Sequence, residues 1–106
     1  MTSQPLVTQE TALAADVPDE SGRLIDQDRI DYLALYIDAM REAVARGADV
    51  RGYFVWSLLD NFEWGAGYAT RFGLVYVDYV TQRRIPKASA RWYADLIRVK
   101  ATRPVR

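Results

Sequence analysis

The sequence contains no cysteine and no histidine. Without cysteine, disulfide bonds and thiolate metal sites are excluded. Without histidine, the chain lacks the commonest metal ligand and the usual general base of enzymes. Any acid–base chemistry must therefore use carboxylates, lysine or tyrosine, and we expect neither a metal ion nor another cofactor.

The chain also lacks an excess of charge of either sign and a long apolar run. Its 14 lysines and arginines balance its 14 aspartates and glutamates, so no overall field attracts a polyanion such as nucleic acid. No apolar stretch approaches the length of a membrane span, and residues 1–15 lack the basic start and apolar run of a signal peptide. We expect a cytoplasmic protein that binds neither nucleic acid nor a membrane.

The 106 residues are half hydrophobic and a quarter charged, which is typical of one small folded domain with a modest core. Residues 4–8 are predicted to form a short strand. A helix follows, capped by Asp26 or Asp28 and ended by Gly47. Its apolar stripe has alternating spacings of three and four and consists of Ile30, Leu33, Ile37, Met40 and Val44.

Residues 50–56 predict a second strand, of the nearly continuous apolar kind found in parallel sheets. Residues 60–70 predict a loop, residues 74–79 a short strand or extended segment, and Pro86 the first position of a last helix. The order predicts an α/β fold built on a βαβ unit, in which both helices cover one face of the sheet. The other face and the strand edges would stay uncovered.

The stretch richest in aromatic residues covers residues 52–79, and the polar residues Asp60, Asn61 and Glu63 lie between its aromatic rings. Flat rings cover the apolar face of a sugar ring while carboxylates and amides bind its hydroxyls, so this composition favours a sugar site. Packing explanations compete with this interpretation. Trp56 could belong to the core, and Asp60 and Asn61 could hold the loop backbone. The tyrosines at 53, 76 and 79 are predicted to be half-buried packing residues.

Residues 56–64 read Trp-Ser-Leu-Leu-Asp-Asn-Phe-Glu-Trp and are followed by Arg71-Phe72-Gly73-Leu74 and Val77-Asp78-Tyr79. This pattern resembles the C-terminal part of glycoside hydrolase family 1, the β-glucosidases, and the resemblance covers roughly residues 5–98. It implies a (β/α)₈ TIM barrel with its site at the C-terminal ends of the strands. The chain would be a single partial domain over residues 1–106. It would hold strand seven, helix seven, strand eight and helix eight, without closing a barrel on its own, and residues 99–106 would be a frayed basic tail.

The resemblance also implies roles for individual residues. Trp56 matches the platform beneath the sugar that the enzyme cleaves off, the glycone. Glu63 and Trp64 match residues that hold its hydroxyls, and Phe72 matches a ring that lines the same pocket. The expected ligand is a β-glucoside or glucose.

The family hydrolyses glycosides with retention, through two carboxylates about 5–5.5 Å apart. The acid/base belongs to an Asn-Glu-Pro motif that this sequence does not contain. The nucleophile belongs to a Thr-Glu-Asn-Gly motif, and the corresponding residues here are Thr8-Gln9-Glu10-Thr11. Direct alignment places Gln9 at the nucleophile position, whereas a register slip of one residue would place Glu10 there. A neutral amide cannot form the glycosyl ester.

Three hypotheses follow. The first is the C-terminal piece of a β-glucosidase, from a truncated, split or misassembled gene and inactive alone. The second is a non-catalytic carbohydrate-binding module. The third is a quarter barrel completed by further copies of the chain or by a separate N-terminal barrel segment.

Overall fold

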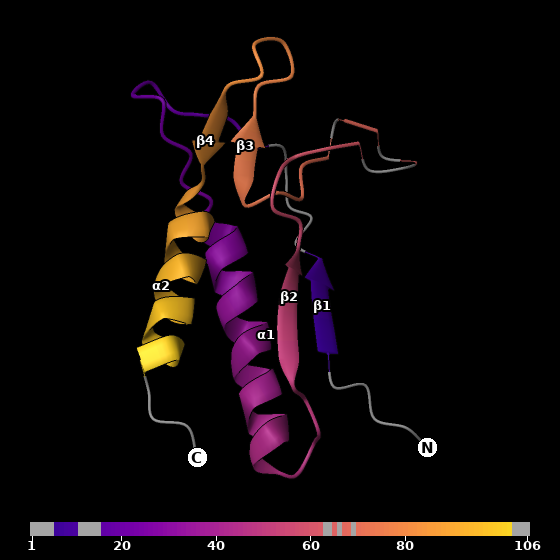
Figure 1. Ribbon diagram of the computed structural model, residues 1–106. Helices are drawn as coiled ribbons and strands as arrows, with labels where there is room; N and C mark the ends of the chain where they lie inside the picture. Colours follow the sequence, from indigo (N-terminus) through magenta and orange to yellow (C-terminus); the bar gives the residue numbers. More distant parts are fainter. Residues whose placement is uncertain (1–5, 11–15, 63–64, 66, 69, 103–106) are drawn as a thin grey trace.

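The computed structural model describes residues 6–10, 16–62, 65, 67–68 and 70–102. Its elements follow one another as strand, helix, three strands and helix (Figure 1). They are β1 (Leu6–Glu10), α1 (Gln27–Ala45), β2 (Gly52–Trp56), β3 (Val75–Val77), β4 (Arg84–Pro86) and α2 (Ala88–Thr102).

The strands β1 and β2 form a parallel pair whose register runs from Leu6 opposite Gly52 to Glu10 opposite Trp56. The helix α1 connects them, so the predicted βαβ unit is confirmed. The helix begins after Asp26, and Gly47 follows its end with a φ of 105°, a conformation that favours glycine. The Asp26 carboxylate makes no capping hydrogen bond to the helix.

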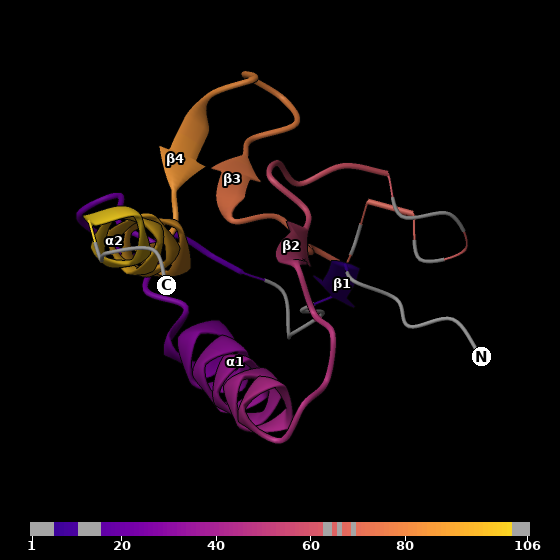
Figure 2. The ribbon, with the colours of Figure 1, turned by 60° about the horizontal axis from the view of Figure 1, so that its bottom comes forward.

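The hydrophobic core lies between the helices and one face of β2. Leu33 and Ile37 of α1 are buried together with Leu74. Tyr53 and Val55 of β2 pack against them, as do four partly buried residues of α2, namely Ala90, Trp92, Tyr93 and Leu96. Both helices therefore cover the same side of the β1–β2 pair, as predicted (Figure 2). Only the middle of the predicted stripe is core, because Val44 in the last turn of α1 is exposed.

Two predictions about the end of the chain are wrong. Pro86 ends β4 instead of opening the last helix, because Arg84–Pro86 pairs antiparallel with β3 and Pro86 lies opposite Val75. Proline is tolerated at such a strand end, where its missing N–H breaks no ladder. Residues 99–102 were predicted as part of a frayed tail, yet they are the last residues of α2. Residues 103–106 lie outside the described part of the chain.

The sheet is open. In the described part of the chain, the strands form two separate two-stranded sheets, β1–β2 and β3–β4. The radius of gyration is 15.5 Å, whereas a compact domain of this length has a radius of about 13 Å. None of the described helices combines the length and apolarity that crossing a membrane requires.

Candidate functional site

The predicted site begins at the C-terminal end of β2. Trp56 is the last residue of this strand, its peptide bond to Ser57 is cis, and 44% of the residue is exposed. Side chains alternate along a strand, so Trp56 and Phe54 lie on the face opposite to the core residues Tyr53 and Val55. Trp56 is therefore not a core residue, and its ring lies on the face of the sheet opposite to the two helices.

Backbone hydrogen bonds fix the base of the loop that follows. The Ser57 N–H donates to the Phe72 carbonyl at 3.1 Å, and the Leu74 N–H donates to the Ser57 carbonyl at 2.9 Å. Two further bonds join Asp60 N–H to the Val75 carbonyl (3.0 Å) and Val75 N–H to the Leu58 carbonyl (2.8 Å). These bonds hold residues 57–60 beside residues 72–75, so both ends of the loop are fixed next to Trp56.

Asp60 is buried and holds this loop base together. Its carboxylate accepts hydrogen bonds from the Gly73 N–H at 3.0 Å, from Arg71 at 2.7 Å and from the Lys87 ammonium at 2.9 Å. Asn61 acts locally as well, because its Nδ2 donates to the Leu59 carbonyl at 2.9 Å. The structural interpretation of Asp60 and Asn61 is thus confirmed.

Asp60 belongs to a buried ion network that the sequence analysis missed. Lys87 lies 2.5 Å from Asp16, and Arg29 lies 3.0 Å from Asp16 and 2.5 Å from Asp26. Asp26 also accepts hydrogen bonds from the N–H and hydroxyl of Ser89. With Asp60 and Arg71, three carboxylates meet three cations, which compensates the cost of burying charge.

The sequence held one signal for this network. Lys87 directly precedes α2, where the helix dipole disfavours a cation. This position is unfavourable for a lysine, but it does not identify the carboxylates that surround Lys87.

Aromatic contacts support the outer part of the loop. The rings of Phe62 and Tyr68 lie 5.3 Å apart, and those of Tyr68 and Tyr79 lie 4.8 Å apart. The Arg71 guanidinium lies over the rings of Tyr76 and Tyr79, at 4.3 Å and 4.5 Å from their centroids. Tyr76 and Tyr79 are half-buried packing residues, as predicted.

The structure brings together two of the predicted sugar-site residues, Trp56 and Phe72. Phe72 is half-buried, and its carbonyl accepts the hydrogen bond from Ser57, the residue after Trp56. Glu63 and Trp64 lie outside the described residues. The candidate nucleophile positions are both in β1, where Gln9 pairs with Val55 and Glu10 pairs with Trp56.

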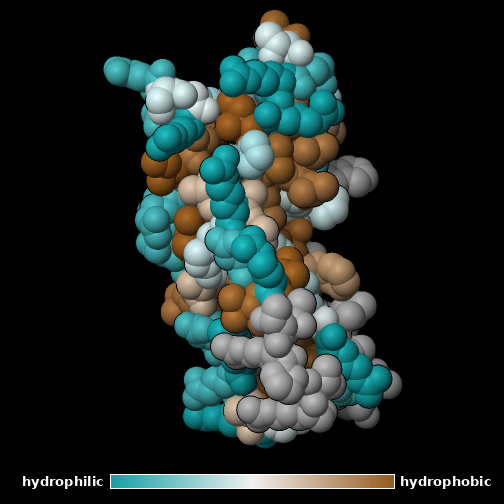
Figure 3. Space-filling model, turned by 60° about the vertical axis from the view of Figure 1, so that its left-hand side comes forward, coloured by the Kyte–Doolittle hydropathy of each residue, from teal (hydrophilic) through white to brown (hydrophobic). Residues whose placement is uncertain are grey.

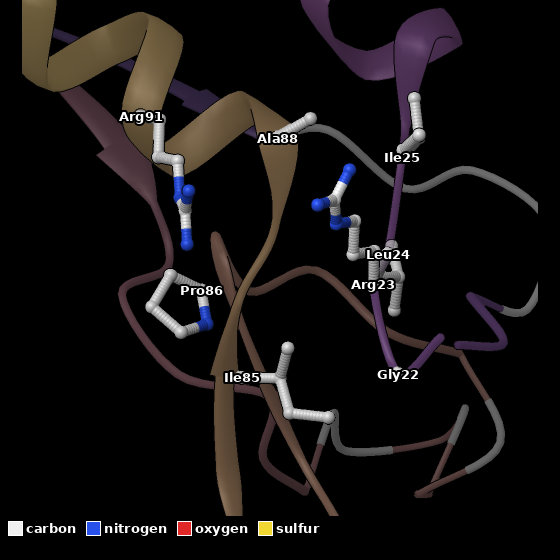
Figure 4. Close-up of a pocket in the computed structure, with 8 residues that line it drawn as sticks. All are labelled: Gly22, Arg23, Leu24, Ile25, Ile85, Pro86, Ala88 and Arg91. Atoms are coloured by element: carbon white, nitrogen blue, oxygen red, sulfur yellow. The ribbon is translucent and has the colours of Figure 1, made fainter. Parts of the chain in front are cut away.

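A separate hollow of about 480 Å³ lies between residues 22–25, the end of β4 and the start of α2. Figure 4 shows the arginine side chains of Arg23 and Arg91 entering it from different segments, beside Ile85 and Pro86. Among the described residues that line it there is no aromatic ring, and neither Trp56 nor Phe72 is one of them. The described residues also contain no cluster of carboxylates that could hold a metal ion.

Comparisons with known proteins agree on one family. The sequence model of glycosyl hydrolase family 1 matches residues 2–102. β-Glucosidase A of Thermotoga maritima is 52% identical over 92 residues, which are 87% of this chain and 21% of the relative. A bifunctional β-D-glucosidase/β-D-fucosidase of Bifidobacterium breve is 48% identical over 98 residues, covering 88% of this chain and 21% of the relative.

Solved structures give the same result. The chain matches a β-glucosidase from Thermotoga maritima in complex with noeuromycin, with a TM-score of 0.83 and 51% identity over 87% of this chain and 21% of that chain. It also matches a psychrophilic β-glucosidase from Micrococcus antarcticus, with a TM-score of 0.84 and 48% identity over 88% and 20% of the two chains. The chain therefore spans about a fifth of the length of these relatives. Its fold is a partial, unclosed piece of their TIM barrel.

Proposed function

Because this chain belongs to glycosyl hydrolase family 1, we propose that it is the C-terminal segment of a retaining β-glucosidase. In this assignment β1 and α1 are the seventh βα unit of the barrel. The strand β2 and helix α2 are the eighth unit, with the β3–β4 hairpin inserted between them. The observation that carries the proposal is the exposed Trp56 at the C-terminal end of β2, beside a loop whose base is fixed by hydrogen bonds.

The proposed role of this segment is to bind the glycone. Trp56 would cover the apolar face of the sugar ring, and Phe72 would line the same pocket. The Glu63 carboxylate would accept hydrogen bonds from two neighbouring hydroxyls, together with Trp64. Asp60 takes no part in sugar binding, since its carboxylate is already bound to Arg71, Lys87 and the loop backbone.

Cleavage requires two carboxylates, and we propose that this chain alone supplies neither. Its sequence has no Asn-Glu-Pro motif for the acid/base, and Gln9 occupies the nucleophile position. Glu10 is the second candidate, because the register sets its backbone beside Trp56, the proposed platform.

A chimaeric enzyme tests the proposal. The part of Thermotoga maritima β-glucosidase A that precedes its seventh barrel strand is joined in front of β1, at Leu6, and hydrolysis of an aryl β-glucoside is measured. We expect no turnover from the chain alone or from the unaltered chimaera, and turnover from the chimaera with Gln9→Glu. Adding Trp56→Ala should then raise KM roughly 3- to 10-fold, the equivalent of a lost aromatic contact.

Two results would change the assignment. Turnover by the unaltered chimaera that Glu10→Gln abolishes would make Glu10 the nucleophile. A folded Gln9→Glu chimaera without turnover would refute the proposed function.

A non-catalytic carbohydrate-binding role is the second candidate function, because the exposed ring of Trp56 needs no catalytic carboxylates to bind a sugar. Calorimetric titration of the chain with glucose and cellobiose tests it. Binding heat at millimolar sugar that Trp56→Ala removes would support this role, and the absence of heat would exclude it.

A further inference from the structure

Phe72, the half-buried residue proposed to line the sugar pocket, is held by backbone hydrogen bonds on both sides. The Arg71 carbonyl before it accepts a hydrogen bond from the Arg29 side chain of α1 at 3.0 Å. The Gly73 N–H after it donates to the Asp60 carboxylate at 3.0 Å. The direction of the Phe72 ring therefore depends on the residues that anchor this short segment.

The Arg71 side chain anchors the segment from within the loop. One of its guanidinium nitrogens donates to the Asp60 carboxylate at 2.7 Å and to the Val77 carbonyl at 2.8 Å. The guanidinium carbon lies 4.3 Å and 4.5 Å from the ring centroids of Tyr76 and Tyr79, within the range of cation–π contacts. These contacts restrict the Arg71 side chain, and with it the peptide that follows.

Arg71 lies at the outer end of the buried ion network. Its side chain is 14% exposed, whereas those of Asp60 and Lys87 are fully buried. Without the Arg71 guanidinium, the Asp60 carboxylate would still be bound by Lys87 at 2.9 Å and by the Gly73 N–H at 3.0 Å. We therefore expect the loss of Arg71 to loosen the segment around it while the rest of the network stays in place.

We propose that Arg71 is a positioning residue for sugar binding and acts through Phe72. The inference rests on the proposed function, in which Phe72 lines the glycone pocket. Arg71 does not contact the sugar in this proposal, because its guanidinium is bound to the Asp60 carboxylate and the Val77 carbonyl. A ring that stacks on a sugar must be held in place by the residues behind it. A displaced ring weakens the binding of substrate and transition state alike, which raises KM and leaves kcat nearly unchanged.

Kinetics of the Gln9→Glu chimaera on an aryl β-glucoside test the proposal. We expect Arg71→Met to raise KM roughly 3- to 10-fold, comparable to the loss of one aromatic contact, and to change kcat by less than about twofold. Phe72→Ala should raise KM by a similar factor. In the double variant KM should be no higher than in Phe72→Ala alone, because Arg71 has no effect without the ring that it positions.

Arg83→Met is the matched control and should leave KM unchanged. Arg83 is exposed in the segment between β3 and β4, at an end of the molecule where Figure 3 shows hydrophilic side chains. If circular dichroism shows that Arg71→Met prevents folding, Arg71→Lys takes its place. This variant keeps a cation near Asp60 but loses the planar guanidinium that lies over the tyrosine rings. Its rise in KM should be smaller and should also disappear in the Phe72→Ala background.

Three results in a folded, active chimaera would overturn the role of Arg71 and leave the proposed function intact. The first is an unchanged KM for Arg71→Met or for Phe72→Ala. The second is a fall in kcat at unchanged KM. The third is an equal rise in KM on Arg71→Met with and without Phe72→Ala, because Arg71 would then act independently of this ring. A folded Gln9→Glu chimaera without turnover instead refutes the proposed function, and this inference with it.

Discussion

Gly73 is a position where the fold has no room for a side chain. A Cβ atom at this residue would lie 2.3 Å from the Asp60 backbone nitrogen and 2.8 Å from the Asp60 carboxylate. The Asp60 nitrogen cannot move freely, because its N–H is bound to the Val75 carbonyl. The glycine is therefore required by close approach of the two ends of the proposed sugar-binding loop.

We expect Gly73→Ala to lower the free energy of unfolding by about 1–3 kcal/mol, the usual cost of overpacking. Urea denaturation followed by circular dichroism measures this change. Gly65→Ala is the matched control in the same loop, since a Cβ at Gly65 meets no atom within 4 Å. Equal effects of the two substitutions would contradict the steric explanation.

Tyr53 should make stability depend on pH in the alkaline range. Burial raises the pKa of its hydroxyl in the folded chain to about 12, against an ordinary value of 10.0. Between these values the unfolded chain releases this proton while the folded chain retains it, so the free energy of unfolding falls as pH rises. Below pH 10 both states keep the proton, so the contribution of Tyr53 to the free energy of unfolding is fully present.

We therefore expect wild-type protein to lose more stability between pH 9 and pH 11.5 than Tyr53→Phe, as measured by urea denaturation at both pH values. At pH 7 the variant should be as stable as wild type or more stable, because the substitution removes a buried hydroxyl without a partner. Parallel losses in the two proteins would show that Tyr53 does not titrate as a buried group.

At the scale of elements, the buried ion network joins segments that are far apart in the sequence. Lys87, directly before α2, bridges Asp16, which precedes α1, and Asp60, which follows β2. The Lys87 and Asp60 side chains are fully buried. Removing one member leaves buried charges without compensation, which costs far more than losing a surface ion pair.

We expect Lys87→Met to lower the free energy of unfolding by about 3–5 kcal/mol. Arg46→Met is the control, because Arg46 and Glu42 form an exposed ion pair whose loss should cost less than about 1 kcal/mol. Urea denaturation of both variants gives the comparison. A loss for Lys87→Met as small as that for Arg46→Met would show that the network contributes little to stability.

Elements with a local signal were predicted from the sequence, and elements that depend on distant partners were not. The stripe of α1 and the apolar run of β2 are periodic within one segment, so their positions were predictable. The strand β4 has three residues and exists because β3 pairs with it, which no local pattern shows. Pro86 was expected to be the first residue of the last helix. It is instead the last residue of β4, and α2 begins at Ala88.

For the candidate site, the motif predicted a sugar platform at Trp56, and the structure shows that this residue is exposed. Its sugar-binding role stays a prediction, as does the choice between Gln9 and Glu10, which depends on strand register. The ion network was missed because it joins Asp16 to Lys87, residues 71 positions apart. Charges of opposite sign are common in any sequence, so their pairing across such a distance is decided by the fold.

At the scale of the whole molecule, the open sheet explains the shape. The extents are 46, 32 and 20 Å, so the molecule is elongated and thin. Among the described residues, the buried hydrophobic side chains are Leu24, Leu33, Ile37, Leu74 and Val77. Large apolar side chains such as Phe54 and Leu58 lie at the surface, where they are 55% and 68% exposed.

The pairing of β1 with β2 also sets an order of events during synthesis and folding. Leu6 lies opposite Gly52, so the parallel sheet cannot start to form until α1 and the residues after it have been made. Long-range pairing of this kind is slow, whereas α1 and the β3–β4 hairpin rely on nearby residues and can form early. The nascent β1 therefore lacks this partner until β2 has been made, and during that interval its backbone N–H and C=O groups stay open to other pairing.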